Sequence, residues 1–62
     1  MKNSQADYIN AGYKYEKATS HDRARAVTKD IRRMLEQEAS VDHADVRYFV
    51  ERGRLEARQE AA

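Results

Sequence analysis

The clearest pattern in the chain lies between residues 20 and 35, where apolar side chains recur at helical spacing. At a helical rotation of about 100° per residue, these side chains form one stripe roughly 120° wide, as a helix that packs against a core requires. The stripe consists of Ala24, Val27, Thr28, Ile31, Met34 and Leu35. Ser20 precedes it, where its hydroxyl can accept a hydrogen bond from the first turn. We therefore expect a helix over residues 21–38, with Ile31 and Leu35 among the most buried side chains.

A second helical pattern occupies the N-terminal part of the chain. Ser4 and Asp7 have the three-residue spacing of a capping box, with the acid shorter than the usual glutamate. The apolar positions that follow predict a helix near residues 4–18. Gly12 lies inside it and costs up to about 1 kcal/mol there. It therefore either weakens this helix or permits another backbone to come close.

A third helix is predicted near residues 43–60. Asp42 is suited to cap it, and Val41 can pack against Val46 as a hydrophobic staple. Gly53 leaves two alternatives open, because glycine can end a helix or lie within one. The helix formers that follow favour continuation. Gly53 and the alanine four residues later would then let another helix backbone approach this face.

These patterns predict an all-α fold for residues 1–62 as one small domain. The chain has no proline and only two glycines, and no stretch alternates as a strand does. We expect the second and third helices to form an antiparallel hairpin at the centre of the fold. The first helix would pack across their apolar stripes.

The size of the chain limits the core that it can build alone. A domain of about 60 residues buries only about 60% of the surface that its unfolded form exposes. The sequence has no cysteine, which excludes disulfides and thiolate metal sites. We therefore expect self-association or a larger protein partner to supply the missing burial. No apolar run has the length of a membrane span or the character of a signal peptide, so we expect a soluble, cytoplasmic protein without membrane contact.

Charge is distributed unevenly, although the net charge is only +1. Residues 1–33 hold eight Lys and Arg against four acids, and residues 34–62 hold four Arg against seven acids. A basic face on the second helix consists of Arg25, Lys29, Arg32 and Arg33. We favour the interpretation that this face is solvated and exchanges ion pairs with the acidic C-terminal half, either within the chain or across a dimer. The alternative is contact with nucleic acid, since arginine suits phosphate recognition.

Catalytic and metal-binding chemistry have little support in the sequence. Asp42, His43 and Asp45 form an acid–histidine cluster, but side chains at these spacings on one helix start do not converge on an ion. Capping explains the acids without a metal. The serines stand at helix boundaries, and there is no glycine-rich phosphate loop. We expect no enzyme activity, no cofactor and no metal.

The third helix carries the feature that best indicates a function. Tyr48 and Leu55 are seven residues apart and lie on the opposite side from Val50, so both would face water in a monomer. Arg52 lies beside them. This seam predicts a helical interaction module that acts as a homodimer or as an adaptor or regulator of a larger protein.

Overall fold

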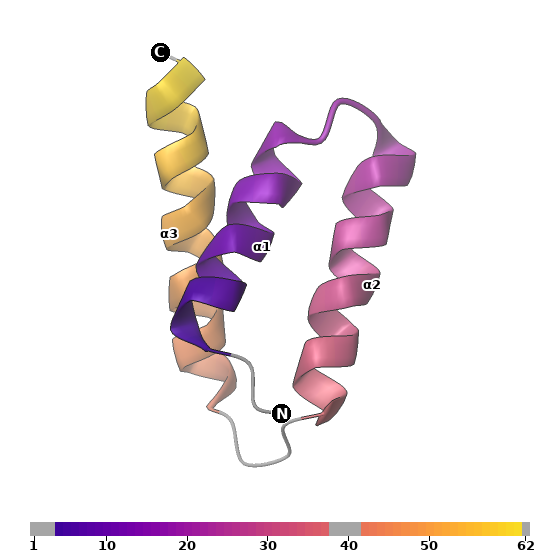
Figure 1. The fold of residues 1–62 in the computed structure, drawn as a ribbon, viewed down its shortest axis with the longest axis vertical. Helices are drawn as coiled ribbons and strands as arrows, with labels where there is room; N and C mark the ends of the chain where they lie inside the picture. The colour runs from indigo at the N-terminus through magenta and orange to yellow at the C-terminus, as the bar shows by residue number, and fades with distance from the viewer. Residues whose placement is uncertain (1–3, 38–41, 62) are drawn as a thin grey trace.

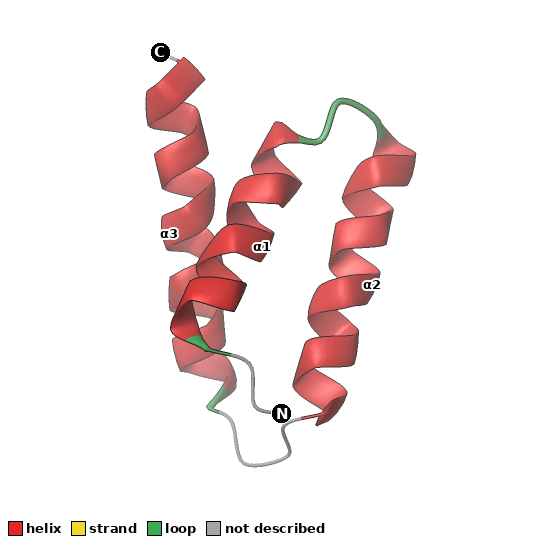
Figure 2. Ribbon diagram, in the orientation of Figure 1, coloured by secondary structure: helices red, strands yellow, loops and turns green. Residues whose placement is uncertain are grey.

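Three helices make up the part of the chain that the structure, a computed structural model, describes: residues 4–37 and 42–61. They are α1 (Gln5–Lys17), α2 (His21–Gln37) and α3 (His43–Ala61). The described residues contain no strand (Figure 2). The predicted all-α class and its three helices are confirmed. Gly53 lies within α3, so the helix continues through it.

Each helix begins at the capping residue that the sequence indicates. At α1, Asp7 donates its backbone N–H to Ser4 Oγ at 3.3 Å, and Asp7 Oδ2 accepts from the Ser4 N–H at 2.8 Å, which completes the capping box. Ser20 Oγ accepts from the amide three residues on at 3.2 Å. Asp42 Oδ1 accepts from the amide two residues on at 2.9 Å. The staple proposed for Val41 lies outside the described residues.

The helix α1 lies between the other two (Figure 1). It packs mainly against α3 and less extensively against α2, while α2 and α3 barely touch. Along the chain, α1 and α3 run in the same direction and α2 runs antiparallel to both. The prediction that the second and third helices form the central pair is therefore wrong. An antiparallel hairpin is present, but α1 and α2 form it.

Two glycines explain why α1 and α3 form the closest pair. Gly12 and Gly53 are buried where the two helices cross. A Cβ atom on Gly12 would lie 2.7 Å from the carbonyl carbon of Val50. A Cβ atom on Gly53 would lie 2.8 Å from the carbonyl carbon of Ile9 and from the backbone nitrogen of Tyr13. The helices therefore touch backbone to backbone, at a distance that a side chain at either position would prevent.

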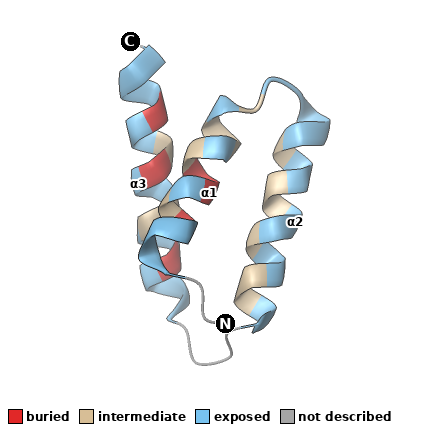
Figure 3. Ribbon diagram, viewed as in Figure 1, coloured by how far each residue is buried: buried red, intermediate tan, exposed pale blue. Residues whose placement is uncertain are grey.

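The buried residues lie on α1 and α3 (Figure 3). The buried apolar residues are Tyr8, Ala11, Val46 and Ala57, with 3%, 9%, 5% and 2% of their surface exposed. Of these, Ala11 lines the space between α1 and α2. No residue of α2 from His21 to Gln37 is buried. The expectation that Ile31 and Leu35 are among the most buried residues is therefore wrong, because both are only half-buried. The physical reason is that α2 has only α1 as a substantial neighbour.

Candidate functional site

The outer face of α3 carries a groove of about 420 Å³ lined by residues of that helix alone: Tyr48, Glu51, Arg52, Leu55 and Arg58. We call these five residues the outer face. Among the described residues, Tyr48 and Leu55 are the exposed large hydrophobic side chains, with 61% and 51% of their surface accessible. The structure thus brings together Tyr48, Arg52 and Leu55, the three residues that the sequence indicates as a contact surface.

The opposite side of α3 fixes the direction of this face. Val46, Gly53 and Ala57 are buried against the rest of the protein, which turns Tyr48 and Leu55 outward. The Tyr48 ring packs edge to face on the half-buried Phe49 ring, with 5.5 Å between centroids and 72° between planes. Such pairs contribute about 0.5–1.5 kcal/mol beyond their buried area. The contact anchors Tyr48 to the helix without covering it.

The charged residues of the outer face already form ion pairs within the chain. Arg52 Nε lies 4.0 Å from Glu56 Oε1, and Arg54 Nη1 lies 3.0 Å from Glu51 Oε1. Arg58 Nε lies 3.3 Å from Glu16 Oε1, and its side chain remains 51% exposed. A guanidinium has five N–H donors, so one ion pair leaves donors for a second acceptor. Both arginines of the outer face can therefore still contact an acidic partner.

A cluster around Glu16 holds this part of α3 against α1. Glu16 Oε1 accepts from Arg54 Nε at 3.0 Å, and the Arg54 guanidinium lies 5.1 Å from the centroid of the Tyr15 ring. The hydrogen bond from Arg54, followed by that from Arg58, holds the pKa of Glu16 below its ordinary value. Sequence reasoning missed this cluster. The available signal was the spacing of Arg54 and Arg58, four residues apart on one side of a helix.

A second cluster joins the C-terminal ends of the same two helices. The Tyr13 hydroxyl donates to Glu60 Oε2, and Lys17 Nζ lies 3.0 Å from the same oxygen. These contacts, Tyr13 first, lower the pKa of Glu60. The pKa of Lys17 is raised, by the Tyr13 hydrogen bond first and then by Glu60. At 100° per residue, Glu60 and Arg54 lie on opposite sides of the buried stripe of α3. The two clusters together therefore fix the rotation of α3 about its own axis relative to α1.

The basic face of α2 is exposed over all four of its residues, Arg25, Lys29, Arg32 and Arg33. Within the described part of the chain, none of them forms an ion pair, since the ion pairs join α1 to α3 or lie within α3. The predicted pairing of this face with the acidic C-terminal half within the chain is therefore wrong for the described residues, and pairing across a dimer stays a prediction. The placement of α2 is the reason, because α1 separates it from α3.

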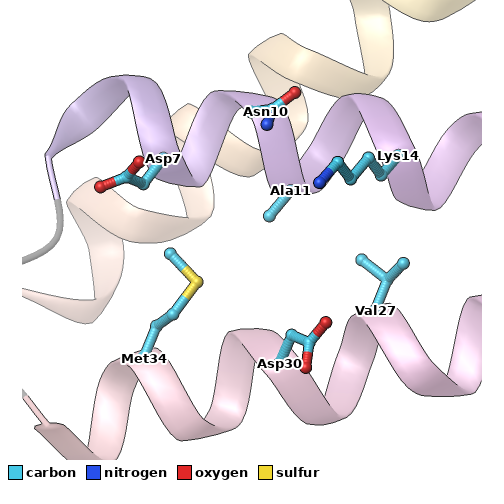
Figure 4. A pocket seen from close by; sticks show the side chains of 7 residues that line it. All are labelled: Asp7, Asn10, Ala11, Lys14, Val27, Asp30 and Met34. Atoms are coloured by element: carbon cyan, nitrogen blue, oxygen red, sulfur yellow. The ribbon is translucent and has the colours of Figure 1, made fainter.

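A cleft of about 220 Å³ lies between α1 and α2. In Figure 4, Val27, Asp30 and Met34 point from α2 toward Ala11 of α1. Pockets that enclose small molecules measure roughly 300–1,000 Å³. The cleft is thus too small to be the main candidate. Among residues 4–37 and 42–61, no group of three or more His, Cys, Asp or Glu side chains is placed to hold a metal ion. None of the helices in these ranges is both long and apolar enough to cross a bilayer.

Comparison with known proteins gives no match to a family model, a curated protein or a solved structure. The two exposed surfaces, the outer face of α3 and the basic face of α2, are therefore the features that indicate a function.

Proposed function

We propose that this protein is a small, non-catalytic helical interaction module that binds an α-helix of a protein partner through the outer face of α3. The partner is a second copy of the chain or a larger protein that the module regulates. The observation that supports this function is the exposure of Tyr48 and Leu55. Both lie on one line of a helix whose opposite side is packed against α1.

The chemistry of the outer face is typical of a protein-binding surface. Tyrosine and arginine are enriched in the energetically important parts of interfaces, and leucine adds apolar area. Fully burying one large apolar side chain contributes roughly 1.5–3 kcal/mol, and Tyr48 and Leu55 have about half of that still to gain. Because the groove is formed by a single helix, we expect a partner to pack across its surface and not to insert into a pocket.

The test compares wild-type protein with the double variant Tyr48→Ser/Leu55→Ser, both purified and in extract of the native host. We expect the wild type to form a species heavier than the monomer and the double variant to lose it. The control is Asn10→Ser/Glu36→Ser, which changes two exposed residues outside both the outer face and the basic face of α2. Measurement is by sedimentation velocity. A wild type that is monomeric in both settings, or a double variant that associates normally, would refute the proposal.

A second candidate function is supported by the basic face of α2, whose four residues form no ion pair with the other described residues. The four basic residues extend over about 12 Å of helix axis, and the DNA major groove is wide enough to admit an α-helix. Because α2 is packed substantially only against α1, its outer side is open to a duplex. We propose contact with nucleic acid as the alternative function.

The alternative predicts binding to a generic DNA duplex that weakens steeply as salt rises, because phosphate contacts release counterions. Arg32→Gln should weaken that binding. Arg47→Gln removes an exposed positive charge from α3 and should not weaken it. Fluorescence anisotropy at several salt concentrations makes the comparison. Equal effects of the two variants would assign any binding to net charge alone.

A further inference from the structure

We infer that the helix covering the outer face of α3 is α3 of a second copy, bound antiparallel with the two-fold axis beside Leu55. This inference rests on the proposed function and names its partner. It follows from the order of charges along the two edges of the outer face, which an antiparallel copy complements.

The two edges lie on either side of the line through Tyr48 and Leu55. At 100° per residue, Glu51 and Arg58 fall on one edge, and Arg52 falls on the other. Glu56, the ion-pair partner of Arg52, lies just outside the outer face and extends this second edge. Each edge therefore carries one acid and one cation. A surface with both signs on each edge can match a copy of itself, as a symmetric two-fold contact requires.

The antiparallel arrangement brings each edge against the same edge of the copy, read in the opposite direction. In this register the two Leu55 residues face each other. Residues on opposite sides of Leu55 in the sequence then come level across the contact when the midpoint between them lies near position 55. The midpoint of Glu51 and Arg58 lies within one position of Leu55, so Glu51 comes level with Arg58 of the copy. The midpoint of Arg52 and Glu56 also lies within one position of Leu55, so Arg52 comes level with Glu56 of the copy. One register therefore brings opposite charges together on both edges and repeats them by symmetry.

A parallel arrangement has the opposite consequence. In a parallel dimer, the edge with Glu51 and Arg58 lies against the edge with Arg52 and Glu56 of the copy. As in a parallel coiled coil, residues five positions apart in the sequence then meet across the contact. Glu51 would then meet Glu56 of the copy, and Arg52 would lie close to its own counterpart. Like charges in such positions are unfavourable and set helix orientation. The charge order thus favours the antiparallel dimer.

The apolar residues fit the same register. The two Leu55 side chains meet at the centre, where each has half of its surface to bury. Along the helix axis, Tyr48 of one copy lies within one helical turn of Gln59 of the other. The Gln59 side-chain amide can therefore form a hydrogen bond with the Tyr48 hydroxyl. Arg58 keeps its intrachain contact with Glu16 and has donors left for the second copy.

Single cysteines test the orientation directly, because the chain has none of its own. The full chain is purified as Leu55→Cys, as Tyr48→Cys and, as the control, as Arg25→Cys on α2, and each is oxidised. A disulfide requires Cα atoms roughly 4.4–6.8 Å apart. We expect Leu55→Cys to form a covalent dimer. Tyr48→Cys should not, because its two copies lie about 20 Å apart along the antiparallel helices.

The outcomes separate this inference from the proposed function. Equal cross-linking at positions 48 and 55 would show a parallel dimer and overturn the inference. Cross-linking at neither position would also overturn it. If association still depends on Tyr48 and Leu55 in that case, the proposed function stands without the antiparallel register. Association that occurs only in host extract and never in purified protein would leave the proposed function intact and exclude the second copy as the partner.

A charge exchange supplies a second test that leaves the apolar residues in place. Glu56→Arg places like charges on one edge of the antiparallel pair and should raise the dissociation constant about tenfold, since two exposed ion pairs become repulsive. Arg52→Glu/Glu56→Arg restores opposite charges both within the helix and across the dimer, so it should recover wild-type association. Equal helicity in all three proteins shows that the monomer is intact. Failure of the double exchange to recover association would overturn the register.

Discussion

Gly12 of α1 and Gly53 of α3 lie at one crossing, and each faces the backbone of the opposite helix. The Gly12 position faces Val50, and the Gly53 position faces Ile9. Helices in proteins usually pack with their axes 8–10 Å apart, at a distance that their side chains set. Here the absence of two side chains lets the backbones touch. This crossing is the centre of the fold, and it makes the glycines the most sensitive positions to test.

Gly12→Ala should destabilise the protein even though alanine is the better helix former. A Cβ atom at this position would lie 2.9 Å from the Val50 Cα and closer still to its carbonyl group, and backbone cannot yield as a flexible side chain can. Forced overpacking typically costs about 1–3 kcal/mol, against about 1 kcal/mol gained in helix propensity. Urea denaturation measures the change. Asn10→Ala, at an exposed position of α1, is the control and should not lower stability.

Tyr8→Ala should lower the free energy of unfolding far more than Ile31→Ala. Tyr8 is 3% exposed and Ile31 is half-buried. Removing a large buried aromatic side chain costs about 3–5 kcal/mol, which approaches the whole stability of a small domain. Ile31→Ala should cost less than the roughly 2–5 kcal/mol typical of a fully buried isoleucine. Thermal melts followed by circular dichroism make the comparison. A larger loss in Ile31→Ala would contradict the placement of the buried core on α1 and α3.

Asp42→Ala should lower the free energy of unfolding by about 0.5–2 kcal/mol at neutral pH. The side chain accepts a hydrogen bond from the Ala44 amide at 2.9 Å, and alanine leaves that amide without its acceptor. Asp42→Asn keeps an oxygen in place and should retain most of the stability, because asparagine caps helices as well as aspartate does. Chemical denaturation of the three proteins is the measurement. Equal loss in both variants would show that the charge matters more than the hydrogen bond.

Acid should weaken the contact between α1 and α3. The pKa of Glu16 lies below its ordinary value of 4.5 in the folded protein, because Arg54 and Arg58 donate to it. A carboxyl with a lowered pKa contributes stability that is complete above its unfolded pKa and is lost as the pH falls through the folded value. The Tm should therefore fall on acidification below about pH 4.5. Glu16→Gln should lower the Tm at neutral pH and reduce that acid-dependent fall.

The matched control for the acid effect is Glu36→Gln on α2. Glu36 is exposed and forms no ion pair within the part of the chain that the structure describes. The Glu36→Gln variant should have a Tm at neutral pH, and a pH dependence of the Tm, close to those of the wild type. An acid-dependent fall that is the same in Glu16→Gln as in the wild type would show that other carboxylates produce it.

The sequence by itself determined the features that depend on neighbours within one helix. The caps at Ser4, Ser20 and Asp42 depend on hydrogen bonds spanning two or three residues, so local spacing was enough to place the helix starts. The outward direction of Tyr48 and Leu55 follows from helical periodicity once the buried stripe of α3 is recognised. These features did not require knowledge of which helix packs against which.

Only the tertiary structure decided which helices pair and how deeply each stripe is buried. The stripe of α2 is the most regular in the sequence, yet Ile31 and Leu35 are only half-buried, because periodicity records where apolar residues lie and not how much neighbouring helices cover them. The choice of α3 as the main partner of α1 depends on backbone contact at Gly12 and Gly53, which are distant in sequence. The Glu16 and Glu60 clusters follow from that choice. Their charges come level only when α1 and α3 run side by side in the same direction.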